Sequence, residues 1–191
     1  MSETLPALSL VAVPGRRPQP LALECAIERR GFAGIHVPSI LSNMAQSVAL
    51  AVATRHLKFA TAIAPIYSRV TEDFAQEAAY IHEISGGRFA FGIGVAHGPS
   101  HVRMGVTPGK PLGDIRAFVA KMRSFEGIGP LPPIILAALR KRMVALAGEI
   151  AEGVIFANAS RSHMPESLSA LPAAKRNDPD FLIADMVPTC I

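Results

Sequence analysis

The chain has 191 residues, of which 50% are hydrophobic and only 18% are charged, so it can bury a core and does not resemble a disordered chain. Its formal net charge of +4 is not concentrated, tryptophan is absent and there are two tyrosines, which argues against a nucleic-acid-binding surface. No stretch approaches the roughly twenty apolar residues of a membrane span. Because Cys25 and Cys190 make no disulfide framework and the amino terminus lacks a signal-peptide pattern, we expect a cytoplasmic protein.

Short apolar runs alternate with helical periods along the whole chain. In chain order, strands are expected at residues 8–13, 34–37, 59–66, 89–95, 133–138, 154–157 and 181–187. Apolar residues at three-four spacing predict a helix after each of the first six strands. The last of these helices is expected from Pro165 to about Arg176, and residues 99–111 are expected to form a loop without a helix start.

The strands are apolar throughout rather than alternating, which is typical of parallel strands covered on both faces. Such an α/β chain folds either as an open doubly wound sheet or as a TIM (β/α)8-type barrel. A full barrel usually takes about 250 residues. As a barrel, the single domain 1–191 would be truncated after strand seven, and the exposed edge of that strand would favour self-association.

Glycines surround the end of the fourth strand, in Gly92-Ile93-Gly94-Val95-Ala96-His97. His97 stands where a dinucleotide-binding loop has its third glycine, and no helix is expected after it, so we reject a nicotinamide site there. Gly92 and Gly94 face the same side of the strand. They either leave a hollow for a flat ligand or allow close packing inside a barrel.

Several segments, in the right order along the chain, resemble the bacterial luciferase-like monooxygenase family, and especially its deazaflavin- or FMN-dependent oxidoreductases. The segments are ERRGF at 28–32, ATAIAP at 60–65, SGGRFAFGIGVAHG at 85–98, PIILAAL at 133–139 and LAGEIAEGV at 146–154. The resemblance implies a TIM-like barrel with FMN or the deazaflavin coenzyme F-420 in its carboxyl-end mouth. It also implies hydride transfer with a small-molecule substrate, and we expect a homodimer.

The resemblance places cofactor-binding residues at the ends of five strands. They are Ser39, Ile63, Ala64, Gly94, Ala137, Ala138, Leu139, Arg140, Asn158, Ala159, Ser160 and Arg161. Ile63-Ala64 matches the position where the family has a bulge or a non-prolyl cis peptide. Backbone N–H groups before Arg140 suit a phosphate or a ring oxygen of the cofactor, and the side chains of Ser160 and Arg161 suit its phosphate. Each role has an alternative: an ordinary strand at Ile63-Ala64, a basic surface cluster at Arg140 and ordinary helix capping by Ser160.

His97 and His101 follow the fourth strand and are the candidate catalytic acid or base, with solvated loop histidines as the alternative. No third ligand has suitable spacing, so no metal site is expected. Many relatives end strand two in an acid-His pair, whereas here His36 lies inside the strand. This departure leaves a second hypothesis, a truncated, non-catalytic barrel that binds a flavin or dimerises. Arg69 and Arg88 are expected to be structural.

Overall fold

The structure, a computed structural model, describes residues 5–39 and 42–189. The strands in this part are β1 (Leu8–Ser9), β2 (Gly34–Pro38), β3 (Lys58–Ala62), β4 (Ala64–Pro65), β5 (Phe89–Gly94), β6 (Ile134–Ala137), β7 (Gly153–Ala157) and β8 (Leu182–Met186). The helices are α1 (Pro18–Arg29), α2 (Asn43–Ala53), α3 (Thr71–Ile84), α4 (Gly98–Met104), α5 (Pro111–Arg123), α6 (Lys141–Ile150), α7 (His163–Leu168) and α8 (Ala173–Arg176). Cys190 lies outside the described residues.

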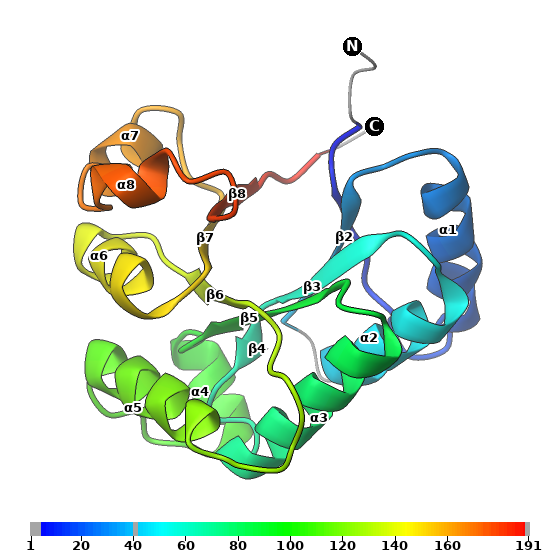
Figure 1. The fold of residues 1–191 in the computed structure, drawn as a ribbon, viewed down its shortest axis with the longest axis horizontal. Helices are drawn as coiled ribbons and strands as arrows, with labels where there is room; N and C mark the ends of the chain where they lie inside the picture. Colours follow the sequence, from blue (N-terminus) through cyan, green and yellow to red (C-terminus); the bar gives the residue numbers. More distant parts are fainter. Residues whose placement is uncertain (1–4, 40–41, 190–191) are drawn as a thin grey trace.

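All strand pairs are parallel, in the order β1-β2-β3-β5-β6-β7-β8, and β4 pairs with β5 beside β3. The sheet curls into a nearly closed barrel with β1 and β8 at its two ends, and the helices cover its outer side (Figure 1). The prediction of an α/β TIM-type barrel is therefore confirmed, and the alternative of an open sheet is excluded. Among the described helices, none combines the length and apolar character that crossing a bilayer requires.

The main core lies between the strands and the helices. Ile35 and Val37 of β2, and Phe89 and Phe91 of β5, point into it and are almost completely buried. The alternate residues face the barrel interior, where a second cluster forms around Ala62, Ile135 and Ile155. Because the strands bury both faces, they show no polar alternation in the sequence.

The third predicted strand, residues 59–66, is divided into β3 and β4. A cis peptide bond joins Ala62 to Ile63 between them. The resemblance placed a bulge or cis peptide at Ile63-Ala64, so the feature occurs one peptide bond earlier than expected.

Two expectations about helices were wrong. Residues 99–111 contain a helix, α4, because Pro99 fits a first helical turn and Gly105 ends the helix in a left-handed conformation with φ 65°. The expected helix from Pro165 to Arg176 is two short helices, α7 and α8. Pro172 lies between them, and it cannot continue a helix because it lacks a backbone N–H group.

Gly92 and Gly94 allow close packing rather than a hollow. A Cβ atom on Gly92 would lie 1.8 Å from the carbonyl oxygen of Thr61, whose hydroxyl donates to the Gly92 carbonyl across 2.7 Å. A Cβ atom on Gly94 would lie 3.0 Å from both the Ala137 Cβ and the Ile63 Cδ1. Of the two alternatives that the sequence left open, the structure favours packing inside the barrel.

Candidate functional site

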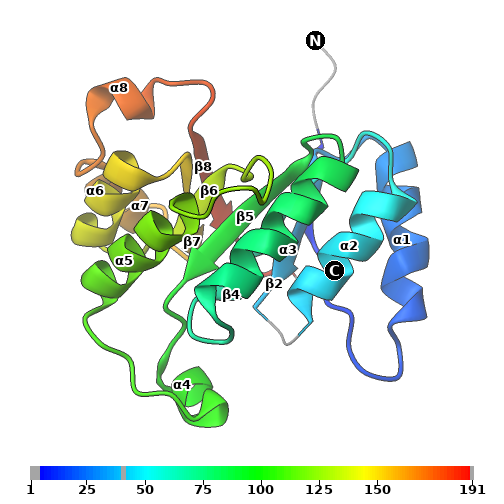
Figure 2. The same cartoon turned by 60° about the horizontal axis from the view of Figure 1, so that its bottom comes forward.

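The carboxyl ends of parallel strands meet at one rim of a barrel, and the loops there carry the sites of barrel enzymes. The residues predicted for a site end or follow β2, β3, β5, β6 and β7, so all of them lie near this rim. Figure 2 shows α4 projecting from the body of the barrel on the side where β5 ends.

A crevice of about 100 Å³ lies beside the rim between three segments of the chain. Its polar lining includes Ser39 after β2, Asn43 at the start of α2, Ser68 and Arg69 after β4, and Arg103 of α4. Ser39 is exposed, as a contact with a bound molecule would require. Hydroxyl, amide and guanidinium groups give this crevice the means to bind oxygen-rich ligand groups.

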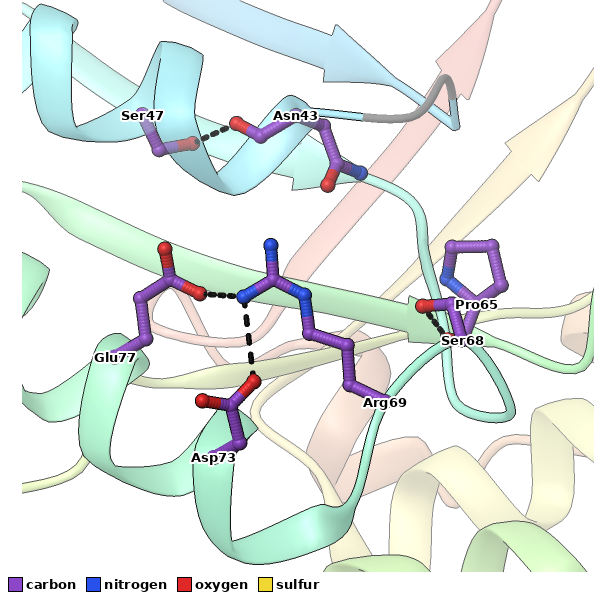
Figure 3. Close-up of polar contacts among 7 residues, drawn as sticks. All are labelled: Asn43, Ser47, Pro65, Ser68, Arg69, Asp73 and Glu77. Carbon is purple, nitrogen blue, oxygen red and sulfur yellow. Dashed lines mark hydrogen bonds and ion pairs between the residues drawn. The ribbon is translucent and has the colours of Figure 1, made fainter.

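Side chains of α2 and α3 hold the rim around β4 in place. The buried side-chain amide of Asn43 donates to the carbonyl of Ile63 across 3.0 Å. Arg69 pairs with Asp73, 3.4 Å away, and also with Glu77 (Figure 3). The structural role predicted for Arg69 is therefore confirmed, and the Arg69 charge is compensated by two acids of α3.

His97 and His101 lie in different environments. His97 is exposed, caps α4 with its carbonyl, and has Nδ1 3.5 Å from the Ser100 hydroxyl. The His101 ring is half-buried, with Nε2 2.5 Å from the Val95 carbonyl, and packs edge-on against Tyr67. Since a carbonyl only accepts hydrogen bonds, His101 Nε2 carries the proton. His97 is thus the more accessible of the two imidazoles.

Strand alternation separates the predicted site residues into two groups. Gly94 and the half-buried Ala137 face the barrel interior. Ala64 and Ala138 point the other way, into the main core under the helices, and are 1% and 4% exposed. The Ala138 N–H already donates to the Ile155 carbonyl across 3.0 Å, so this amide is not available to a ligand.

The loop after β6 is tied to α7. Leu139 is half-exposed, and its carbonyl oxygen lies 2.6 Å from His163 Nε2 and accepts a bond from the Ser167 hydroxyl at 3.0 Å. Arg140, the next residue, is exposed and precedes α6 directly. The structure therefore ties the loop after β6 to α7, the helix that follows the loop after β7.

The loop after β7 turns sharply before α7. Asn158 is exposed with a left-handed φ of 57°, and the Ala159 N–H donates to the Asp185 carboxylate at 3.3 Å. The Ser160 hydroxyl accepts from a backbone N–H of α7 at 3.2 Å, which is the ordinary capping role left open by the sequence. Arg161 is exposed.

Two residues near the site were not among the site residues predicted from the sequence. His36 alternates with the buried Ile35 and Val37, so its ring faces the interior, where Nδ1 is buried without a hydrogen-bond partner among the described residues. Burial lowers the pKa of His36, so the ring is neutral at neutral pH. Strand alternation could have indicated this orientation. Asn43 gave no signal, because its partner, the Ile63 carbonyl, is 20 residues away.

Comparison with known proteins places this geometry in a family. The family model for luciferase-like monooxygenases matches residues 21–191. A curated relative, 5,10-methylenetetrahydromethanopterin reductase of Methanolobus tindarius, is 26% identical over 156 residues, which cover 70% of this chain and 48% of the relative. The chain thus spans about half the length of this relative.

Solved structures share the fold. The coenzyme F-420-dependent tetrahydromethanopterin reductase of Methanopyrus kandleri has a TM-score of 0.76 at 22% identity, over 96% of this chain and 65% of that one. The FMN-bound oxygenating constituent of 3,6-diketocamphane monooxygenase from Pseudomonas putida has a TM-score of 0.74 at 14% identity, over 94% and 66%. Since the family model covers most of the described barrel, the chain belongs to the luciferase-like monooxygenase family.

Proposed function

We propose that this chain is the cofactor-binding part of a flavin- or deazaflavin-dependent oxidoreductase that transfers hydride to or from a small-molecule substrate. The observation that carries the proposal is the family match over residues 21–191. Similar proteins are named for dependence on F-420 or for binding FMN, so either cofactor fits the family. The chain spans 48% of its curated relative, so the substrate is not inferred from that protein.

The donor groups at the rim fit a cofactor phosphate. Arg140 and Arg161 are exposed after β6 and after β7, and neither forms an ion pair within residues 5–39 and 42–189. Lys141 pairs with Glu166 of α7, at 3.2 Å. Cations at a helix start oppose the helix dipole, and a bound anion would relieve that repulsion. We therefore assign the phosphate to the loops after β6 and β7.

A planar ring bearing hydrogen-bond donors would have to bind at the mouth, next to the closely packed barrel interior. Ala62 and Ala137, which face that interior, have small side chains, and His36 has a buried Nδ1 without a partner among the described residues. A bound flavin or deazaflavin would supply the hydride donor or acceptor. His97, exposed at the end of β5, is the chain's own group for holding or moving a proton, whereas the His101 Nε2 proton is bound to the Val95 carbonyl.

A second candidate is a non-catalytic barrel that binds the cofactor. It is favoured by Pro38 at the end of β2 and Ser39 after it, where many relatives have an acid-His pair. It is also favoured by the His101 ring, whose Nε2 already bonds the Val95 carbonyl. Turnover separates the two candidates, because only the oxidoreductase oxidises or reduces the bound cofactor with a substrate present.

A titration of the purified chain with FMN and with F-420, followed by visible absorbance and fluorescence, tests the proposal. Replacing both Arg140 and Arg161 by alanine should weaken binding by about 10-fold or more, since each charge-assisted hydrogen bond contributes about 1.5–3 kcal/mol. Arg29→Ala, an exposed change at the end of α1, is the control and should leave affinity unchanged. No binding of either cofactor at tens of micromolar would reject the proposal.

We also infer a cytoplasmic homodimer, as expected from the sequence. Light scattering over a range of protein concentrations tests the dimer, and a monomer at all concentrations would exclude it.

A further inference from the structure

A buried polar pair lies between the first two helices. Glu24 of α1 is fully buried and Gln46 of α2 is 6% exposed. The Gln46 side-chain nitrogen donates to Glu24 Oε1 across 3.1 Å. The Glu24 carboxyl group therefore has no surface in contact with solvent, and the site at the barrel mouth does not include it.

Each of these two side chains has one oxygen without a hydrogen-bond partner among the described residues. Glu24 Oε2 and Gln46 Oε1 are both buried and accept no hydrogen bond from the described residues. A charged carboxylate can only accept, so it would leave both oxygens unsatisfied. A proton on Glu24 Oε2 would turn that atom into a donor, with Gln46 Oε1 as its acceptor. Acid and amide would then form two reciprocal hydrogen bonds, which would satisfy both oxygens.

No nearby cation offers an alternative. The ionisable groups on α1 and on the segments packed against it are Cys25, Glu28, Arg29, His36, Arg55, His56 and Arg88. In the described part of the chain none of them pairs with Glu24, and α2 itself contains no ionisable residue. Burying an unpaired carboxylate is far less favourable than burying the neutral acid.

The pair is connected to the rim through the first turn of α2. Gln46 and Asn43 are three residues apart, on adjacent positions of one helix face. Asn43 in turn donates to the Ile63 carbonyl at the rim, and the Ser47 hydroxyl donates to the Asn43 carbonyl across 2.9 Å. Movement of this turn would therefore move the Asn43 amide.

We propose that Glu24 is a neutral carboxylic acid in the folded protein and acts as a positioning residue, holding Gln46 and with it the turn of α2 that presents Asn43 to the rim. The significance of this contact for a cofactor rests on the proposed function, whereas the protonation of Glu24 and the position of Asn43 do not. Loss of the proton would break the reciprocal pair and loosen the turn.

The expected pH dependence has a definite sign. Burial raises the pKa of Glu24, and the bond from Gln46 lowers it by less. The folded protein then holds a proton that the unfolded chain releases above its ordinary carboxyl pKa of about 4.3. Stability should fall as the pH rises from that value to the raised pKa of the folded state.

The test uses the cofactor-free chain, with Glu24→Gln and Glu24→Ala as variants. Glu24→Gln supplies a permanent amide donor for Gln46 Oε1, so this variant should keep the Asn43 side-chain NMR signals of the wild type and should not lose stability as the pH rises. Glu24→Ala should shift those signals. Glu72→Gln, the same change at an exposed residue of α3, should retain the wild-type pH profile.

Infrared spectroscopy with carbon-13-labelled glutamate, recorded as the pH is raised above the ordinary carboxyl pKa of about 4.3, gives a direct readout. We expect a protonated carboxyl band in the wild type that disappears in Glu24→Gln and persists in Glu72→Gln. Absence of that band, or equal pH profiles for wild type and Glu24→Gln, would overturn the proposal. Because no cofactor is added, this failure is distinct from a failure to bind FMN or F-420.

Discussion

The side-chain amide of Asn43 donates to the backbone carbonyl of Ile63 across 3.0 Å, joining the first turn of α2 to the segment between β3 and β4. Ile63 directly follows the cis peptide bond, and its side chain lies beside Gly94 in the barrel interior. One buried amide thus connects the outer helical layer to the mouth of the barrel.

Removing this contact should destabilise the protein. Asn43→Ala leaves the Ile63 carbonyl without its donor, and we expect a loss of about 1–3 kcal/mol in the free energy of unfolding. Asn43→Asp should cost more, because it sets a carboxylate against a carbonyl oxygen. Urea unfolding measures both, with the exposed Asn177→Ala as control. Equal stability of Asn43→Ala and the control would contradict the prediction.

Glu28 should stabilise the protein at neutral pH and lose this effect in acid. Its Oε1 accepts from the backbone N–H groups of Arg55, His56 and Leu57 at 2.8, 2.6 and 2.8 Å. Burial acts to raise the pKa of Glu28, but the three backbone bonds and the His56 charge outweigh it, and the pKa is lowered. The carboxylate contribution is then complete above the unfolded pKa of about 4.3 and is lost as pH falls through the lower folded value.

Glu28→Gln tests this by urea unfolding between pH 3 and 7. The variant should be less stable by about 1–3 kcal/mol at pH 7, and the difference should shrink in acid. Glu126→Gln, at an exposed position in the loop after α5, is the control. A difference that stays constant with pH would contradict the assignment. Glu24, one turn earlier on α1, is expected to respond to pH in the opposite direction.

The protein should not tolerate replacement of Arg88, even by lysine. Its guanidinium donates at 2.7–3.0 Å to the carbonyls of Ser85, Leu57, Ala51 and Thr54 and to the Thr54 hydroxyl, so the structural role predicted from the sequence is confirmed. A lysine ammonium cannot reproduce that planar set of donors.

We expect Arg88→Lys to lower the free energy of unfolding by about 2–4 kcal/mol, through buried acceptors left without donors. Arg103→Lys, on the exposed face of α4, should change it by less than about 0.5 kcal/mol. Thermal or urea unfolding of both variants checks this, and a tolerated Arg88→Lys would show that water replaces the lost donors.

Gly92 and Gly94 should differ in their tolerance of alanine. At Gly92 the new Cβ would overlap the backbone oxygen of Thr61 at 1.8 Å, and that backbone cannot move without disturbing the pairing of β3 and β5. We expect a loss above about 4 kcal/mol or failure to fold. At Gly94 the neighbours are side chains at 3.0 Å, which can adjust at a cost of about 1–3 kcal/mol. Soluble yield and unfolding midpoints rank the two variants, and a more harmful Gly94→Ala would refute this account.

The order of strands and helices could be predicted because it depends on local patterns. The apolar runs at 34–37 and 89–95 are strands in the structure, and the helix expected after the third strand is α3. Element ends were less predictable. Residues 99–111 were expected to form a loop, but Pro99 lies in the first turn of a short helix, α4, and Gly105 caps its carboxyl end.

The arrangement of the candidate site needed the tertiary structure. The sequence by itself determined a βα chain with parallel, doubly covered strands, since burial on both faces leaves continuous apolar runs. It could not determine that His101 turns to the Val95 carbonyl, or that Asn43 reaches Ile63. Such contacts join atoms that local periodicity does not relate, and only the curvature of the sheet and the packing of α2 and α4 bring them within hydrogen-bond distance.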